Sequence, residues 1–297
     1  YLKDVPMSPK DERQKAEKAA KEKGEDITYP TIEELIAEDN YQDPFLIFIV
    51  KDLEGNQVRK IESKPTKGMN RVVWNLRYPS TSPIQLKKAK TGRYSNPDEG
   101  PMALPGDYTV EMFMSENGKL SQLHEAVKFK VNQFENSSLT RDSDENLAFK
   151  KDLSELRRRF LGSSSEMSDL GERLSYLKKA VIDAPNADLA WMNEINVMET
   201  DERKIKIKMW GDHHRSGRDI ETSPSTGGRI ETIVYQAWYS TANVTSTQTE
   251  QLKIAKVEYA DIRKNMDDLK FRIEAMEKRM NLKGIPYTPN RIDWKVD

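Results

Sequence analysis

The chain has 297 residues, 33% of them charged and 36% hydrophobic, and its net charge is -1, so it lacks the basic excess typical of a general nucleic-acid or anionic-membrane binder. No apolar run approaches the ~20 residues of a membrane span, and the absence of cysteine excludes disulfides, thiolate zinc sites and cysteine nucleophiles. The length is sufficient for two domains of roughly 100–200 residues each.

Residues 1–42 predict the remnant of a strand followed by a charged helical excursion. The first residue is Tyr1 and no signal peptide is recognisable, so we expect a fragment or processed piece of a larger protein. Pro9 to Gly24 contains no large apolar residue, which is typical of an exposed helix. Thr31 and Glu34 have the spacing of a capping box and predict a short helix. One face of that helix is apolar and available to a neighbour: Ile32, Leu35 and Ile36.

Residues 43–135 show the two-residue period of strands. Phe45 to Val50 is a continuous apolar run, typical of a strand covered on both faces. Asn117-Gly118 between two alternating segments predicts a hairpin. The segment 68–78 predicts a further strand, because Val72, Trp74, Leu76 and Tyr78 alternate on one face. Several short antiparallel strands with tight turns predict an immunoglobulin-like β-sandwich, interrupted by a long loop over 80–104.

In residues 138–283 the apolar residues recur at alternating spacings of three and four, which predicts helices. The two longest apolar stripes run from Phe149 to Val181 and from Ala255 to Met280, and two shorter stripes lie between them. Such regular stripes need helical partners, so we expect an antiparallel bundle with two long helices. The fold class is therefore α+β. The remaining residues, 284–297, are expected to form an extended tail that packs back along the protein.

The only cluster of potential metal ligands is Asp212-His213-His214. Adjacent histidines point in different directions unless the backbone bends, and no third histidine is near in the sequence. We therefore favour a loop contact or a helix cap, and predict no metal and no other cofactor. A metal-dependent hydrolase that uses these three residues is the third and least favoured interpretation.

Aromatic residues on either side of the 211–228 loop allow two interpretations. Trp210, Tyr235, Trp238 and Tyr239 would suit a platform on which sugar rings stack. We favour instead that both tryptophans pack in the bundle and close the loop over its end. No catalytic residue is predicted. The candidate contacts for a ligand or a partner are Trp210, Asp212, His213, His214, Trp238 and Tyr239.

Three sequence blocks occur in a characteristic order: 52–59, 68–78 and 100–110. Together they resemble the region that follows the β-propeller in large secreted bacterial proteins, called sortilin-like or BNR-repeat glycosyl-hydrolase-like. In that family an immunoglobulin-like domain, similar to that of flagellar hook-capping proteins, follows the propeller, and a helical segment ends the chain. Later blocks are also similar to the family: 223–229, 247–251 and 286–291.

The resemblance implies a location outside the cytoplasm: the periplasm, the outer-membrane surface or the medium. It also implies that the propeller carries any glycosidase site, so no family catalytic residue is transferred to this chain. We expect a non-catalytic C-terminal module that docks on its own propeller or on a cell-envelope protein, with no nucleic-acid partner. The alternative is an accessory module of a BNR-repeat glycoside hydrolase that contacts carbohydrate.

Overall fold

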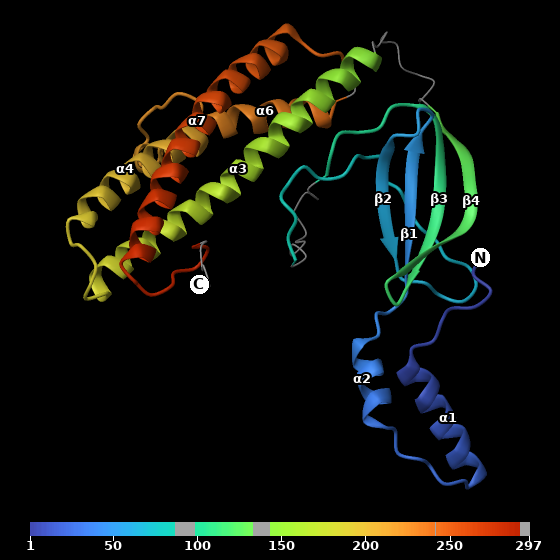
Figure 1. The fold of residues 1–297 in the computed structure, drawn as a ribbon. Coiled ribbons are helices and arrows are strands. Elements are labelled where there is room, and N and C mark those ends of the chain that lie inside the picture. The colour runs from blue at the N-terminus through green and yellow to red at the C-terminus, as the bar shows by residue number, and fades with distance from the viewer. Residues whose placement is uncertain (87–98, 133–142, 241, 292–297) are drawn as a thin grey trace. The chain divides into compact units, whose positions relative to one another are not determined.

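The computed structural model describes residues 1–86, 99–132, 143–240 and 242–291, and the chain divides into two compact units. The first unit comprises 1–79 and 102–137, and the second comprises 80–101 and 138–297. The described residues form seven helices and one open antiparallel sheet of four strands (Figure 1). In this part of the chain no helix has the length and apolar character needed to cross a membrane.

A helical hairpin opens the first unit: α1 (Pro9–Lys23) and α2 (Ile32–Asn40). α2 begins with the predicted capping box, in which Thr31 Oγ1 accepts the Glu34 N–H at 3.2 Å and Glu34 accepts the Thr31 N–H at 2.8 Å. Arg13 of α1 donates to both carboxylate oxygens of Glu38 in α2, at 2.6 and 2.9 Å. Neither helix contains a buried residue. The two helices are therefore joined by polar contacts rather than by an apolar core.

The sheet of the first unit has the strand order β2-β1-β3-β4, and each neighbouring pair is antiparallel. Its strands are β1 (Phe45–Asp52), β2 (Gln57–Ser63), β3 (Gly106–Glu116) and β4 (Lys119–Val131). The apolar run forms β1, which lies between β2 and β3. Only Leu46 and Val50 of this strand are buried, so the strand covered on both faces that the run predicts is not found in the described residues. The Asn117-Gly118 turn joins β3 to β4, and both of its residues have positive φ, 46° and 76°.

The prediction of a strand over 68–78 is wrong, because the segment pairs with no other strand. Its side chains nevertheless alternate between less exposed and more exposed positions. Val72 and Trp74 are less exposed than their neighbours, yet the segment joins no ladder and has only isolated bridges at its two ends. Leu76 has a φ of 58°, which interrupts the extended backbone that a ladder needs. Trp74 instead lays its ring edge-on against Tyr108 of β3, with ring centroids 5.3 Å apart. The described residues thus contain one sheet and not the two facing sheets of the predicted sandwich.

The second unit is a helical bundle with the two long helices that the stripes predict. They are α3 (Ser143–Asp183) and α7 (Ser246–Leu282). Ion pairs join Asp152 to Lys256 and Arg173 to Glu277, so α3 and α7 run parallel to each other. The shorter helices of the unit are α4 (Trp191–Trp210), α5 (His213–Ser216) and α6 (Thr226–Trp238).

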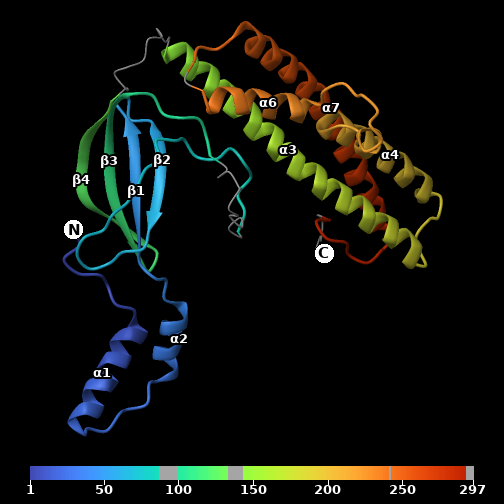
Figure 2. The same cartoon turned by 180° about the vertical axis from the view of Figure 1, so that it is seen from behind.

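α4 and α6 together serve as the third helix of the bundle. Lys178, near the end of α3, pairs with Glu199 in α4, whereas Arg157, nearer its start, pairs with Glu231 in α6. The chain therefore returns along α3 first as α4 and then as α6, antiparallel to it. Figure 2 shows α6 and α4 one after the other alongside α3. The bundle is thus a three-helix arrangement whose middle helix is broken over 211–225.

The tail packs on the bundle as far as the described residues extend. Ile285 is 3% exposed and belongs to the bundle core, and Arg291, 4% exposed, donates to the Ile285 carbonyl at 2.6 Å. The later part of the predicted tail, with Trp294, lies outside the described residues.

Candidate functional site

The structure places the six candidate contact residues in two separate groups. Trp210, Asp212, His213 and His214 lie together where the middle helix is broken, between the end of α4 and α5. Trp238 and Tyr239 lie at the far end of α6. Gly227, at the start of α6, touches Trp210, and Trp238 is roughly 17 Å further along the helix at about 1.5 Å per residue. The two groups therefore do not form one site.

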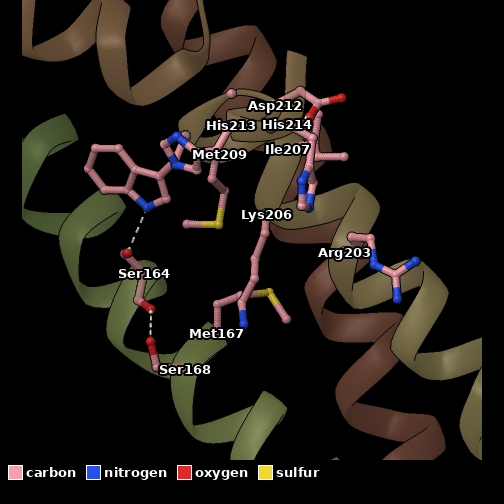
Figure 3. A pocket seen from close by; sticks show the side chains of 12 residues that line it. Ser164, Met167, Ser168, Arg203, Lys206, Ile207, Met209, Asp212, His213 and His214 are labelled. Atoms are coloured by element: carbon pink, nitrogen blue, oxygen red, sulfur yellow. Dashed lines mark hydrogen bonds between the residues drawn. The ribbon is translucent and has the colours of Figure 1, made fainter. Parts of the chain in front are cut away.

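A cavity of about 320 Å³ opens beside the break (Figure 3). α3, α4 and α5 each contribute to its lining. Its apolar surface comes from Met167, Ile207, Met209 and Trp210, and its polar surface includes Ser164, Ser168, Arg203, Lys206, Asp212, His213 and His214. Met167 and Met209 are buried, while Trp210 is 37% exposed. The cavity thus has an apolar floor and a polar, mainly basic rim.

Trp210 forms one wall of the cavity and is held from three sides. Its Nε1 donates to Ser164 Oγ on α3 at 2.9 Å, and its ring meets Phe160 edge-on with centroids 5.1 Å apart. A Cβ atom on Gly227 would lie only 2.7 Å from the Trp210 ring. Glycine at 227 therefore allows α6 to begin directly against the indole, so Trp210 closes one side of the break while exposing part of its ring.

Asp212 and the two histidines follow on the rim of the cavity. Asp212 Oδ1 accepts the N–H groups of His214 and Arg215, at 3.0 and 3.2 Å, and so caps α5. In Figure 3 the ring of His213 turns toward Met209, whereas that of His214 lies beside Ile207. The part of the chain that the structure describes contains no group of three or more residues suited to hold a metal ion. Asp212 thus has the capping role that we favoured from the sequence.

Trp238 and Tyr239 have different environments. Trp238 is 3% exposed within the bundle core, and the Arg157 guanidinium lies 5.3 Å from the centre of its ring. Tyr239 is 54% exposed, and its ring lies 5.8 Å from that of Tyr235, which is 70% exposed. The two tyrosines form a small exposed aromatic pair, and Trp238 packs inside the bundle.

Sequence reasoning missed the basic residues that α4 brings to the cavity. Arg203 and Lys206 are one turn apart on α4, and Lys206 pairs with Glu202. The Glu202–Lys206 pair lies over Gly171 of α3, where a Cβ atom would come within 2.8 Å of Glu202 Oε1. Small residues on the facing side of α3 were the available signal, because they leave space beside a long helix: Ser164, Ser168, Gly171 and Ser175.

A second candidate surface, which we call the hairpin patch, consists of Tyr29, Ile32, Leu35 and Ile36. These side chains are 89%, 71%, 37% and 54% exposed, respectively. No Lys or Arg occurs in 25–43, whereas Asp and Glu are frequent there. Apolar side chains at i, i+3 and i+4 on a helix are the pattern by which an amphipathic helix binds a groove.

These two surfaces differ in charge: the hairpin patch lies in the acidic segment 25–43, and the cavity beside Trp210 has a basic rim. Their geometry is the ground for a functional inference, because no model of a known family, no curated protein and no solved structure matches this chain.

Proposed function

We propose that this chain is a non-catalytic structural and interaction module of a larger β-propeller protein of the sortilin-like kind, acting outside the cytoplasm. The observation that carries the proposal is the hairpin patch, whose four apolar side chains are exposed on a helical hairpin without any buried residue. We further propose that this hairpin docks on the propeller of the same polypeptide.

The hairpin has little internal stabilisation. Isolated helices shorter than about 12–15 residues are marginal in water, and α1 and α2 have 15 and 9 residues. Their link through Arg13 and Glu38 is partly exposed, and such ion pairs contribute little. A surface that covered Ile32, Leu35 and Ile36 would add about 25 cal/mol per Å² of apolar area removed from water. We therefore expect a binding partner to stabilise this hairpin.

The charge around the patch indicates what kind of surface it fits. Glu33, Glu34 and Asp39 lie on or beside the helix that carries Ile32 and Ile36. Complementary potentials favour a partner surface with the opposite sign. The partner surface on the propeller is therefore an apolar groove with Lys or Arg at its rim. The other binding partner that an experiment has to distinguish is a cell-envelope protein with the same kind of groove.

The test measures binding of this chain to the separately produced propeller of its parent protein by calorimetry. Replacing Ile32, Leu35 and Ile36 together with Ser should weaken binding at least about tenfold, since buried apolar anchors dominate such interfaces. Binding should also weaken as salt is added, because the rim contacts are ionic.

The matched control replaces three exposed apolar residues of the bundle, Val197, Val257 and Phe271, with Ser. These side chains are 56%, 72% and 71% exposed, and their loss should leave binding unchanged. Binding that the hairpin variant retains in full would overturn the docking role of the patch. If the propeller does not bind at all while a cell-envelope protein crosslinks at position 36, docking on the propeller is wrong.

We also propose that the first unit is a reduced immunoglobulin-like sandwich, in which 68–78 takes the place of the second sheet. Trp74 packs against both Tyr108 and Phe129, which lie on one face of the sheet. The hydroxyl of Tyr108, near the start of β3, donates to the Leu104 carbonyl at 2.6 Å. A tyrosine that bonds to the backbone a few residues upstream at the start of a strand is a hallmark of such sandwiches.

The alternative, a carbohydrate-contacting accessory module, has less geometric support. A stacking platform needs several exposed rings in one place. Trp210 and the Tyr235–Tyr239 pair lie at opposite ends of α6, and Trp238 is in the core. Tyr235 and Tyr239 remain the residues on which a sugar contact would depend.

A further inference from the structure

The cavity beside Trp210 has the size and lining of a site for a small organic molecule. Its volume of about 320 Å³ falls in the usual range of roughly 300–1,000 Å³ for such sites, which are mostly apolar with a few placed polar groups. Met167 and Met209 provide a floor that adapts to the shape of an apolar body, since methionine is flexible and polarisable. The half-exposed indole of Trp210 offers a flat wall.

The charged groups around the cavity leave Arg203 available. Glu199, one turn earlier on α4, pairs with Lys178, and Glu202, which directly precedes Arg203, pairs with Lys206. Asp212, the acidic residue in the lining, is directed at the backbone N–H groups of α5. Among the described residues, the Arg203 side chain has no ion pair or hydrogen bond. Its positive charge at the rim is thus not neutralised by a neighbour.

Lys206 and His213 also line the cavity, and both are exposed. Figure 3 shows Lys206 extending from α4 toward Met167 of α3, and His213 beside Met209. Gly171 leaves the space that the Glu202–Lys206 pair occupies. An anionic group that enters the cavity can therefore be met by the unpaired Arg203, with the Lys206 ammonium of the Glu202–Lys206 pair close by, while its apolar part contacts the methionines and Trp210.

We propose that this cavity binds a small organic carboxylate whose carboxylate group is joined to a planar or branched apolar body. Arginine and lysine supply charge-assisted hydrogen bonds to the carboxylate, and Trp210, Met167 and Met209 exclude water from the apolar body. This site is independent of the docking function: the hairpin patch and the cavity belong to different units of the chain, and either can fail without the other.

The experiment titrates the full chain with 2-naphthoate and follows the indole Nε1–H signal of Trp210 by NMR, with calorimetry for the affinity. Two further probes separate the parts of the ligand: 2-naphthalenemethanol has the same body without the charge, and acetate has the charge without the body. We expect 2-naphthoate to bind and each of the other two to bind at least about tenfold more weakly, because each lacks one half of the contacts.

Arg203→Gln should weaken binding of 2-naphthoate about fivefold, as expected for a partly exposed charge contact, and leave 2-naphthalenemethanol unaffected. Lys204→Gln is the matched control, since Lys204 is the next residue on α4 and its side chain is 68% exposed; it should bind like the parent chain. Both variants change exposed residues, and an unchanged thermal melt shows that they fold. Equal binding of the charged and uncharged naphthalenes, or no shift of the Trp210 signal at millimolar 2-naphthoate, would overturn the proposal.

Discussion

At the scale of single residues, burial and one hydrogen bond together determine the protonation state and the role of Tyr108. It is 5% exposed, and its ring lies 5.9 Å from that of Phe129. Burial, with smaller contributions from the nearby Tyr78 and Asp52, raises the pKa of Tyr108 to about 12. The hydroxyl must stay neutral to donate to the Leu104 carbonyl. Tyr108 therefore links the turn before β3 to the core only in its protonated form.

Tyr108→Phe should lower the free energy of unfolding of the first unit by about 1–2 kcal/mol, because a part-buried carbonyl loses its donor.

The stabilisation that Tyr108 provides should also depend on pH, with a definite sign. The folded pKa is raised above the unfolded value of about 10, so the stabilisation is complete below pH 10 and is lost as the pH rises through about 12. Denaturant unfolding at pH 7 and 11 measures both effects. Tyr29→Phe, at an 89% exposed residue, is the control; equal behaviour of the two variants would contradict the role of Tyr108.

At the scale of elements, the two long helices of the bundle differ from its middle helix, which is broken. α3 and α7 are continuous and are held by an apolar seam with ion pairs beside it. Arg173 donates to both carboxylate oxygens of Glu277, at 2.9 and 2.7 Å, and their side chains are only 12% and 5% exposed. This pair sets the register of α3 against α7 at one level of the bundle.

Glu277→Ala should destabilise the bundle by about 3–5 kcal/mol, because it leaves the buried Arg173 charge without its partner. Replacing both residues with apolar ones, Arg173→Met with Glu277→Leu, should restore much of that loss. Chemical denaturation followed by circular dichroism at 222 nm measures both. The exposed Lys179–Asp183 pair serves as the control, and Asp183→Ala should cost less than about 1 kcal/mol. A Glu277→Ala effect no larger than that of Asp183→Ala would refute the buried-pair argument.

At the scale of the whole molecule, the two units have cores of very different size. The bundle core includes residues from α3, α4, α6 and α7 and the tail residue Ile285. The main apolar cluster of the first unit has four buried residues, Val50, Val58, Ala103 and Tyr108, with partly buried neighbours. Because apolar burial supplies most of the stability, the sheet unit should be the weaker of the two.

Calorimetry should therefore show two transitions, with the sheet unit melting first. Leu170→Ala in the bundle, where the side chain is 1% exposed, should lower the upper transition, as expected for a loss of about 2–5 kcal/mol. Trp74→Ala should lower only the first transition. A single transition that both substitutions shift equally would contradict this assignment.

Much of the fold was predictable because its causes are local. The capping box of Thr31 and Glu34, the Asn117-Gly118 turn and the two long stripes each depend on residues within a few positions of one another. The candidate site was predictable only in part. Trp210, Asp212 and His213 are neighbours in the chain, whereas no pattern in the sequence indicates that Arg203 borders a cavity. The strand predicted over 68–78 was wrong because period-two alternation reports which side chains face a core, not whether the backbone finds a ladder partner.

The period of each segment follows from the order of its residues alone, and with it the α+β class, the capped helix ends and the apolar face of each element. Which faces meet depends on the tertiary structure: α4 and α6 act as one broken helix between α3 and α7, Trp210 borders a cavity, and Ile32 and Ile36 remain exposed. The burial of Trp238, by contrast, was already favoured from the sequence. The physical reason is that periodicity follows from bonds between near neighbours in the chain, whereas burial depends on contacts between residues far apart in sequence.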